Sequence, residues 1–139
     1  MPTNTEFLVL TEDRSGVLAQ VFSALGARDV NILALQSFPT GENRVTRFVV
    51  DNPTRCKEVL VSEGLTYAEA EVVQAKIPHR PGEIARVASL LVARGIDIKY
   101  VYCGLEADTN APVVFFSVSE IGKAASLIER TASASAKVA

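Results

Sequence analysis

The sequence has few of the side chains that build metal sites and nucleophilic catalytic centres. Its 139 residues include one histidine, His79, two cysteines, Cys56 and Cys103, and no tryptophan. A single histidine leaves a zinc site or a histidine-containing triad without its usual groups. The cysteines have neither metal-ligand spacing nor a disulfide framework. We therefore expect no metal, no cofactor and no enzymatic activity, and the cysteine usage favours a reducing cytoplasm.

Long apolar runs and an excess of basic residues are also missing. The longest apolar stretches, such as Val113–Phe116, have the length of a strand and fall far short of the roughly 20 residues of a membrane span. The N-terminal residues show no basic region followed by an apolar segment, so we expect no signal peptide. With 14 Lys and Arg against 16 Asp and Glu, the net charge is −2. We therefore expect neither a membrane nor a nucleic acid as partner.

The sequence does have a large apolar fraction and an internal repeat. Hydrophobic residues make up 48%, which is ample for a core and excludes disorder as the main state. Arg14–Ala19 returns as Arg80–Ala85, a shift of 66 residues. Without gaps, nine of the 19 positions from 14 to 32 are identical (14, 16, 19, 21, 23, 25, 27, 28 and 32). The repeat predicts two units, residues 1–70 and 71–139.

Each repeat predicts a strand, a helix, a strand hairpin and a second helix. The expected strands are 7–10, 32–38, 45–50, 72–77, 98–103 and 113–118, and the expected helices are 17–28, 53–64, 81–95 and 122–131. Pro53 suits the first position of its helix, with Asn52 as the N-cap. The fold class is therefore α+β, with two ferredoxin-like β-α-β-β-α-β units whose antiparallel sheets have helices packed on one face.

Two segments leave this prediction open. Residues 66–77 must hold the last strand of the first unit and the first strand of the second, with no Gly or Pro between them. Either one long strand serves both sheets or the chain bends near residues 69–71. Residues 132–139 are a poor strand by propensity. We expect the second unit to lack a well-formed fourth strand, with its tail frayed after Thr131.

The segments that repeat best resemble the ACT domain family, the small ligand-sensing modules of amino-acid metabolism. The resemblance rests on Asp13-Arg14-Ser15-Gly16-Val17-Leu18-Ala19 with Val30-Asn31-Ile32, and on His79-Arg80-Pro81-Gly82-Glu83-Ile84-Ala85 with Ile96-Asp97-Ile98. It covers residues 5–77 and 71–131 and implies a tandem ACT protein without an attached catalytic domain. The family implies a ferredoxin-like fold that binds a free amino acid near the turn between strand 1 and helix 1, often between two ACT units.

Carried over by position, the resemblance implies two ligand sites. The first has Asp13, Arg14, Ser15, Gly16, Val17 and Leu18, with Asn31 and Ile32 opposite; the second has His79, Arg80, Pro81, Gly82, Glu83 and Ile84, with Asp97 and Ile98. The chemistry of the residues supports this placement. The exposed N–H groups of a helix start suit a carboxylate, and glycine lets a ligand approach the backbone. Asn or Asp can accept from the ligand's ammonium group.

Structural alternatives remain for these residues. The two glycines also serve backbone geometry, and Asn31 and Asp97 also suit a cap or turn. Glu83 in a first helical turn is favourable to the helix dipole. The remaining alternatives are solvent exposure for His79, sheet cover rather than pocket lining for Tyr100 and Tyr102, and a solvated sheet edge for Arg44 and Arg47.

Two functions are compatible with these features of the sequence. The first is a regulatory protein that binds a free amino acid and transmits its occupancy, either through a homodimer or other homo-oligomer or to an enzyme of amino-acid metabolism. The alternative is a regulatory or scaffolding subunit of an amino-acid-biosynthesis enzyme with no ligand of its own. Acylphosphatase activity and RNA binding share only the general fold, which is no argument for function.

Overall fold

The computed structural model describes residues 3–138, with side chains up to Arg130, and the chain divides into two compact units. The N-terminal unit is Thr5–Ala70, and the C-terminal unit begins at Glu71 and also takes in Thr3 and Asn4. Each unit combines antiparallel strands with two helices. The predicted α+β class is confirmed at this level.

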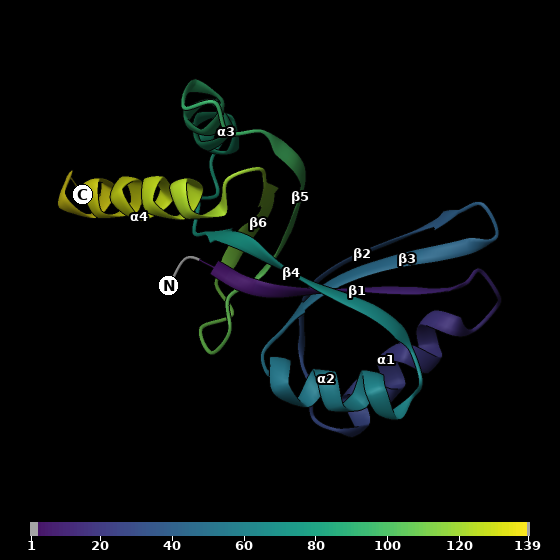
Figure 1. Ribbon diagram of the computed structural model, residues 1–139. Coiled ribbons are helices and arrows are strands. Elements are labelled where there is room, and N and C mark those ends of the chain that lie inside the picture. Colours follow the sequence, from purple (N-terminus) through teal and green to yellow (C-terminus); the bar gives the residue numbers. More distant parts are fainter. Residues whose placement is uncertain (1–2, 139) are drawn as a thin grey trace. The chain divides into compact units, whose positions relative to one another are not determined.

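The elements follow one another in the expected alternation (Figure 1). They are β1 (Thr3–Glu12), α1 (Val17–Ala27), β2 (Ile32–Thr40), β3 (Asn43–Val50), α2 (Pro53–Ser62), β4 (Thr66–Ala75), α3 (Glu83–Ala93), β5 (Ile98–Leu105), β6 (Pro112–Val118) and α4 (Ile121–Val138). β1 and β4 contribute residues to both units.

In the N-terminal unit the strand order is β2-β3-β1-β4, and β1 and β2 both pair antiparallel with β3. Helices α1 and α2 lie next to each other on one face of these strands (Figure 1). The core between helices and strands contains Phe7 and Phe48, whose rings stack with centroids 6.0 Å apart. Leu25 and Leu60 complete it from the helices, and all four side chains are fully buried.

In the C-terminal unit the order is β4-β6-β5, again antiparallel. Leu91 of α3 and Ala124 of α4 pack on the strand residue Phe116 in a second buried core. On the other side of β4 lies the beginning of β1, where Asn4 Nδ2 donates to Gln74 Oε1 at 3.2 Å. In this unit, the strand position next to β4 is therefore occupied by the first residues of β1.

The structure settles the two segments that the sequence left open, residues 66–77 and the end of the last helix. β4 runs without a break from Thr66 to Ala75, so the single long strand is the alternative present. The expected helix end near Thr131 is wrong, because α4 continues to Val138. The Ala- and Ser-rich run after Thr131 contains no Gly or Pro, and alanine has the highest helix propensity. Residues 132–138 are therefore helical, and Ala139 lies outside the described residues.

The repeat extends to the backbone conformation at both helix starts. Gly16 precedes α1 with φ 82°, and Gly82 precedes α3 with φ 86°, both in the left-handed region that side-chain-bearing residues rarely adopt. The α2 helix begins as the sequence predicts, with Pro53 at its first position and the Asn52 side chain accepting from the Arg55 N–H at 3.1 Å. The two glycine turns set the geometry of the candidate sites.

Candidate functional site

The turn between β1 and α1 opens onto a hollow of about 420 Å³, here called the turn hollow. It is lined by seven consecutive residues and one arginine of β3, namely Asp13, Arg14, Ser15, Gly16, Val17, Leu18, Ala19 and Arg44. Six of these are the predicted first-site residues 13–18. The structure therefore brings this part of the predicted site together around one open space.

The start of α1 presents backbone N–H groups to the turn hollow. The first N–H groups of a helix have no carbonyl partner within the helix. Gly16 occupies the N-cap position, and no side chain caps α1 from there. Leu18 and Ala19, in the first turn, line the hollow. An anionic group placed here would meet N–H donors and the positive end of the helix dipole.

Charged side chains frame the turn hollow. The Arg44 guanidinium donates from Nε to Asp13 Oδ1 at 3.1 Å and from Nη1 to Ser37 Oγ at 3.0 Å. Arg14 Nη2 donates to Gln20 Oε1 at 2.8 Å. The hollow thus combines two cations with one carboxylate, which matches the paired charges of a free amino acid.

Arg44 was expected on a solvated sheet edge, and its place in the hollow was missed. It arrives there because β3 pairs with β1 in a register that sets Arg44 opposite Thr11. That pairing joins residues more than 30 positions apart in the chain. No local pattern in the sequence around residue 44 carries this information.

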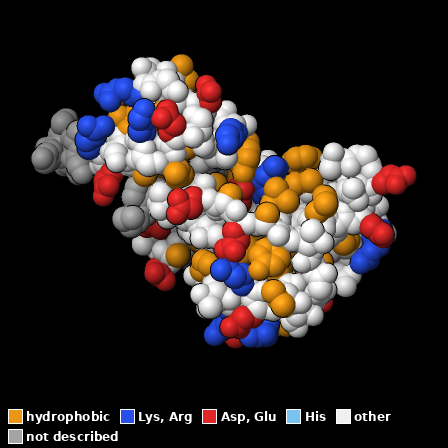
Figure 2. Space-filling model, viewed as in Figure 1, with side chains coloured by type: hydrophobic (Ala, Val, Ile, Leu, Met, Phe, Trp, Pro, Cys, Tyr) orange, Lys and Arg blue, Asp and Glu red, His pale blue; other side chains and the backbone are white. Residues whose placement is uncertain are grey.

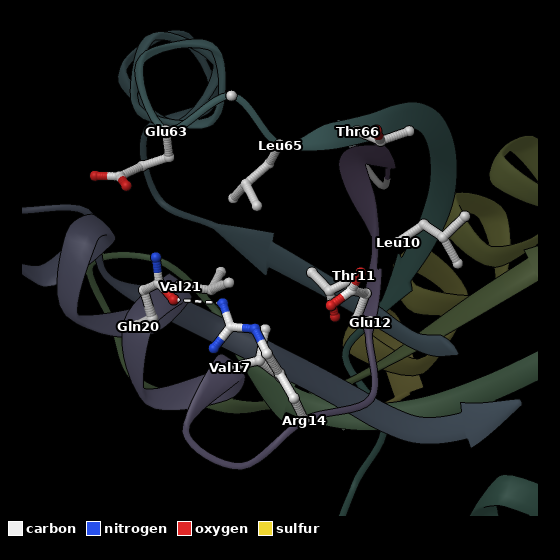
Figure 3. Close-up of a pocket in the computed structure, with 11 residues that line it drawn as sticks. Leu10, Thr11, Glu12, Arg14, Val17, Gln20, Val21, Glu63, Leu65 and Thr66 are labelled. Carbon is white, nitrogen blue, oxygen red and sulfur yellow. Dashed lines mark hydrogen bonds between the residues drawn. The ribbon is translucent and has the colours of Figure 1, made fainter. Parts of the chain in front are cut away.

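A second cavity adjoins the same turn, and we call it the sheet-end pocket (Figure 3). It has a volume of about 220 Å³ and is lined by Leu10, Thr11, Glu12, Arg14, Val17, Gln20, Val21, Glu63, Gly64, Leu65 and Thr66. Figure 3 shows Arg14 reaching toward Gln20 from the end of β1, with Glu63 and Leu65 on the segment that joins α2 to β4. The Thr11 hydroxyl is buried there and has no hydrogen-bond partner among the residues that the structure describes. Arg14 and Val17 line both spaces.

Asn31 and Ile32 lie away from the turn hollow and are not among its lining residues. They follow the C-terminal end of α1, whereas the turn precedes its N-terminal end, and an 11-residue helix is about 16 Å long. The Asn31 backbone N–H donates to Asp51 Oδ1 at 2.9 Å, and Ile32 packs on the core. Within one unit, the predicted first site is therefore split between the two ends of a helix.

The C-terminal unit repeats this split. Asp97 and Ile98 follow the end of α3, where the Asp97 N–H donates to Ser119 Oγ at 3.0 Å and Ile98 packs on the core. His79, Arg80, Pro81, Gly82 and Ile84 are exposed in the turn before α3 or at its start. In both predicted sites, the turn residues and the strand-start residues therefore lie at opposite ends of a helix.

Glu83 differs from its counterpart in the first unit. Its carboxylate accepts from Arg80 Nη2 at 3.2 Å and from Arg86 Nε at 3.0 Å, and its side chain is 18% exposed. Val17, at the matching position of α1, is buried and carries no charge. The acidic group of the second turn is therefore occupied by two arginines of its own unit.

Among the described residues, one buried cysteine has a clearly shifted pKa. Burial raises the pKa of the Cys56 thiol to about 12, with the nearby Glu69 carboxylate adding to the rise, so this thiol stays protonated. Within residues 3–138, no cluster of His, Cys, Asp and Glu side chains is placed to hold a metal ion. No described helix is long and apolar enough to cross a membrane.

Comparisons with known proteins agree with the turn-and-helix geometry. The family model of the ACT domain matches residues 5–60, which include most of β1, the Gly16 turn, α1, β2, β3 and most of α2. The match supports a ligand-binding regulatory role, rather than a catalytic one, for this part of the chain. No curated protein matches the sequence.

Solved structures share the fold over nearly the whole chain. A protein of Bacteroides thetaiotaomicron aligns with a TM-score of 0.83 and 24% identity, covering 94% of this chain and 89% of that one. The ligand-free regulatory subunit of aspartate kinase from Thermus thermophilus gives 0.62 and 17%, with 93% and 91% covered. The corresponding subunit from Thermus flavus gives 0.57 and 15%, with 94% and 96% covered. At these identities the likeness establishes the fold.

Proposed function

We propose that this chain is a regulatory protein with two tandem ACT units that binds a free amino acid at its glycine turns. The observation that carries the proposal is the turn hollow, where uncapped N–H groups of α1 face an open space framed by Arg14, Arg44 and Asp13. The ligand carboxylate would meet the helix start, and its ammonium group would be accepted by a carboxylate or amide oxygen.

The split geometry supports a site completed between two copies of the chain. Asn31 and Ile32 lie about one helix length from the first turn, and Asp97 and Ile98 lie equally far from the second. In this proposal, each ligand joins the turn of one copy of the chain to the strand start of another copy. Binding then favours the packing that closes the site, because the ligand has higher affinity for that arrangement.

The two sites are proposed to differ in affinity. Glu83 already accepts from Arg80 and Arg86, so a ligand ammonium would have to compete with two guanidinium groups. In the first turn, Asp13 is engaged by one arginine, Arg44. We therefore expect the N-terminal turn to be the tighter site.

A thermal-shift screen against the twenty amino acids tests this function. A ligand at 100 times its Kd stabilises the folded chain by about 2.7 kcal/mol, which raises the Tm of a chain of this size by roughly 10 °C. We expect one amino acid, or a chemically related pair, to produce a saturable shift. The absence of a shift with all twenty would reject the amino-acid-binding function.

The turn itself is tested with matched glycine variants. Gly16→Val and Gly41→Val both place a side chain at a positive φ, 82° and 65°, with no heavy atom within 4 Å of the new Cβ. Gly41 lies in the β2–β3 hairpin and does not line the turn hollow. Affinity should fall by at least tenfold for Gly16→Val and stay unchanged for Gly41→Val. Equal effects of the two variants would refute the placement.

The alternative function is a regulatory or scaffolding subunit that has no ligand and holds a partner enzyme. It is supported by apolar side chains on the last strand at each end of the strand order. On β2, Leu35 is 46% exposed and Phe38 is 42% exposed, and on β5, Val101 is 44% exposed. Two of the solved structures with this fold are described as regulatory subunits of aspartate kinase. A negative amino-acid screen together with a stable complex with an enzyme would favour this alternative.

A further inference from the structure

A hollow with three basic side chains lies in the C-terminal unit, at the opposite end of α3 from the Gly82 turn. We call it the basic hollow; its volume is about 480 Å³, and it is lined by Arg94, Ile96, Gly122, Lys123, Ser126, Leu127 and Arg130. Arg94 follows the end of α3, and Lys123, Ser126 and Arg130 belong to α4. Figure 2 shows Lys and Arg side chains grouped over this end of the C-terminal unit, in a chain whose net charge is −2.

The internal repeat provides a reference for these residues. Asp51 Oδ1 accepts from the Asn31 N–H before α2, and Ser119 Oγ accepts from the Asp97 N–H before α4. Residues 51 and 119 are therefore equivalent, a shift of 68. The same shift makes Ser126 the counterpart of Glu58.

The N-terminal unit neutralises its basic residue at this place. Arg28, the counterpart of Arg94, donates from Nη2 to Glu58 Oε2 at 3.1 Å. In the C-terminal unit, Ser126 stands where that carboxylate would be. The C-terminal unit therefore lacks the carboxylate that would form an ion pair with Arg94.

At this position the C-terminal unit also has a cation that the N-terminal unit does not have. Arg130 takes the position of Ser62, and neither Arg94 nor Arg130 forms an ion pair among the described residues. Lys123 Nζ lies 3.0 Å from Glu120 Oε1, which leaves two of the three cations unneutralised. Residues 131–139 contain no Asp or Glu.

We propose that the basic hollow binds a small ligand carrying two phosphate groups. Two guanidinium groups and an ammonium group supply charge-assisted donors, and guanidinium matches phosphate oxygens in a bidentate geometry. Gly122 and Lys123 lie in the first turn of α4, where the dipole favours an anion. Ser126 adds a hydroxyl donor without negative charge. This site is separate from the amino-acid site, and neither proposal depends on the other.

Titration calorimetry of the full chain with inorganic pyrophosphate tests the proposal. We expect saturable binding at one site per chain, weakening as salt rises because exposed charges are screened. Acetate, with one charge and no phosphate geometry, should bind at least tenfold more weakly. No saturable pyrophosphate binding, or equal affinity for acetate, would overturn the proposal.

Two serine variants separate a specific site from a general charge effect. Ser126→Glu restores at the hollow the acid that the N-terminal unit has at Glu58, whereas Ser62→Glu makes the same change on α2. Each lowers the net charge by one. Losing a charge-assisted contact corresponds to about tenfold in affinity, so pyrophosphate should bind about tenfold more weakly to Ser126→Glu.

The same titration of Ser62→Glu should give the wild-type affinity within twofold. Equal losses in the two serine variants would show a non-specific charge effect and overturn the site. Arg130→Gln provides a second route, because it removes a cation from an exposed helix face without burying anything. Circular dichroism on each variant verifies that the helices are intact, and unchanged pyrophosphate affinity in folded Arg130→Gln would also contradict the proposal.

Discussion

Replacing Gly16 with alanine should destabilise the chain, whereas the same replacement at Gly26 should stabilise it. Neither new Cβ would meet a heavy atom within 4 Å, so sterics against the rest of the protein do not decide the sign. The backbone does. Gly16 has φ 82°, where an L side chain costs roughly 1–2 kcal/mol. Gly26 lies inside α1, where alanine gains about 0.5–1 kcal/mol over glycine.

Urea unfolding followed by far-ultraviolet circular dichroism measures both effects. The difference between the two variants should be about 1.5–3 kcal/mol, well above the uncertainty of the method. Gly16→Asn serves as a further control, because asparagine tolerates the left-handed region better than alanine does. If Gly16→Ala matched Gly26→Ala in sign, the left-handed turn that shapes the turn hollow would be wrong.

Four further outcomes are expected. Asn52→Ala removes the α2 cap and should cost about 1 kcal/mol in urea unfolding; no loss would mean that the cap does not form in solution. Because the pKa of buried Cys56 is raised to about 12, a thiol reagent at pH 8 should modify exposed Cys103 alone in the native chain and both thiols in denaturant. The same raised pKa means that Cys56 leaves stability unaffected below pH 9 and lowers it as the pH rises from about 9 toward 12. We propose that the homodimer expected from the sequence forms through the exposed Leu35 and Phe38 of β2; replacing both by lysine should then give monomers in sedimentation velocity, and an unchanged mass would remove β2 as the interface.

Local sequence patterns were enough to predict the positions of most helices and strands. The apolar periodicity after Gly16 predicted α1, and the same periodicity after Gly82 predicted α3. Such predictions succeed because the apolar face of a helix follows from the spacing of residues three and four positions apart. Asn52 and Pro53 marked the start of α2 for the same reason. The end of α4 was misplaced, since a run of Ala and Ser has no sharp stop signal and a low β-propensity does not exclude a longer helix.

Only part of the candidate site could be predicted from the sequence. The consecutive residues 13–18 form one turn, so their proximity follows from the chain itself. Arg44 reaches them through the pairing of β1 with β3, and the register of distant strands is not readable from either segment. The distance between Asn31 and the turn depends on the direction and length of α1, which the resemblance to a family did not supply for a single unit.

Amide chemical shifts of the ¹⁵N-labelled chain, recorded with each of the twenty amino acids, test the proposed amino-acid binding most directly. We expect one amino acid to shift the Leu18 and Ala19 N–H resonances at the start of α1, together with those of Asn31 and Ile32, in a saturable manner. Resonances that stay unchanged with every amino acid, or that shift only outside the glycine turns and strand starts, would contradict binding at these turns.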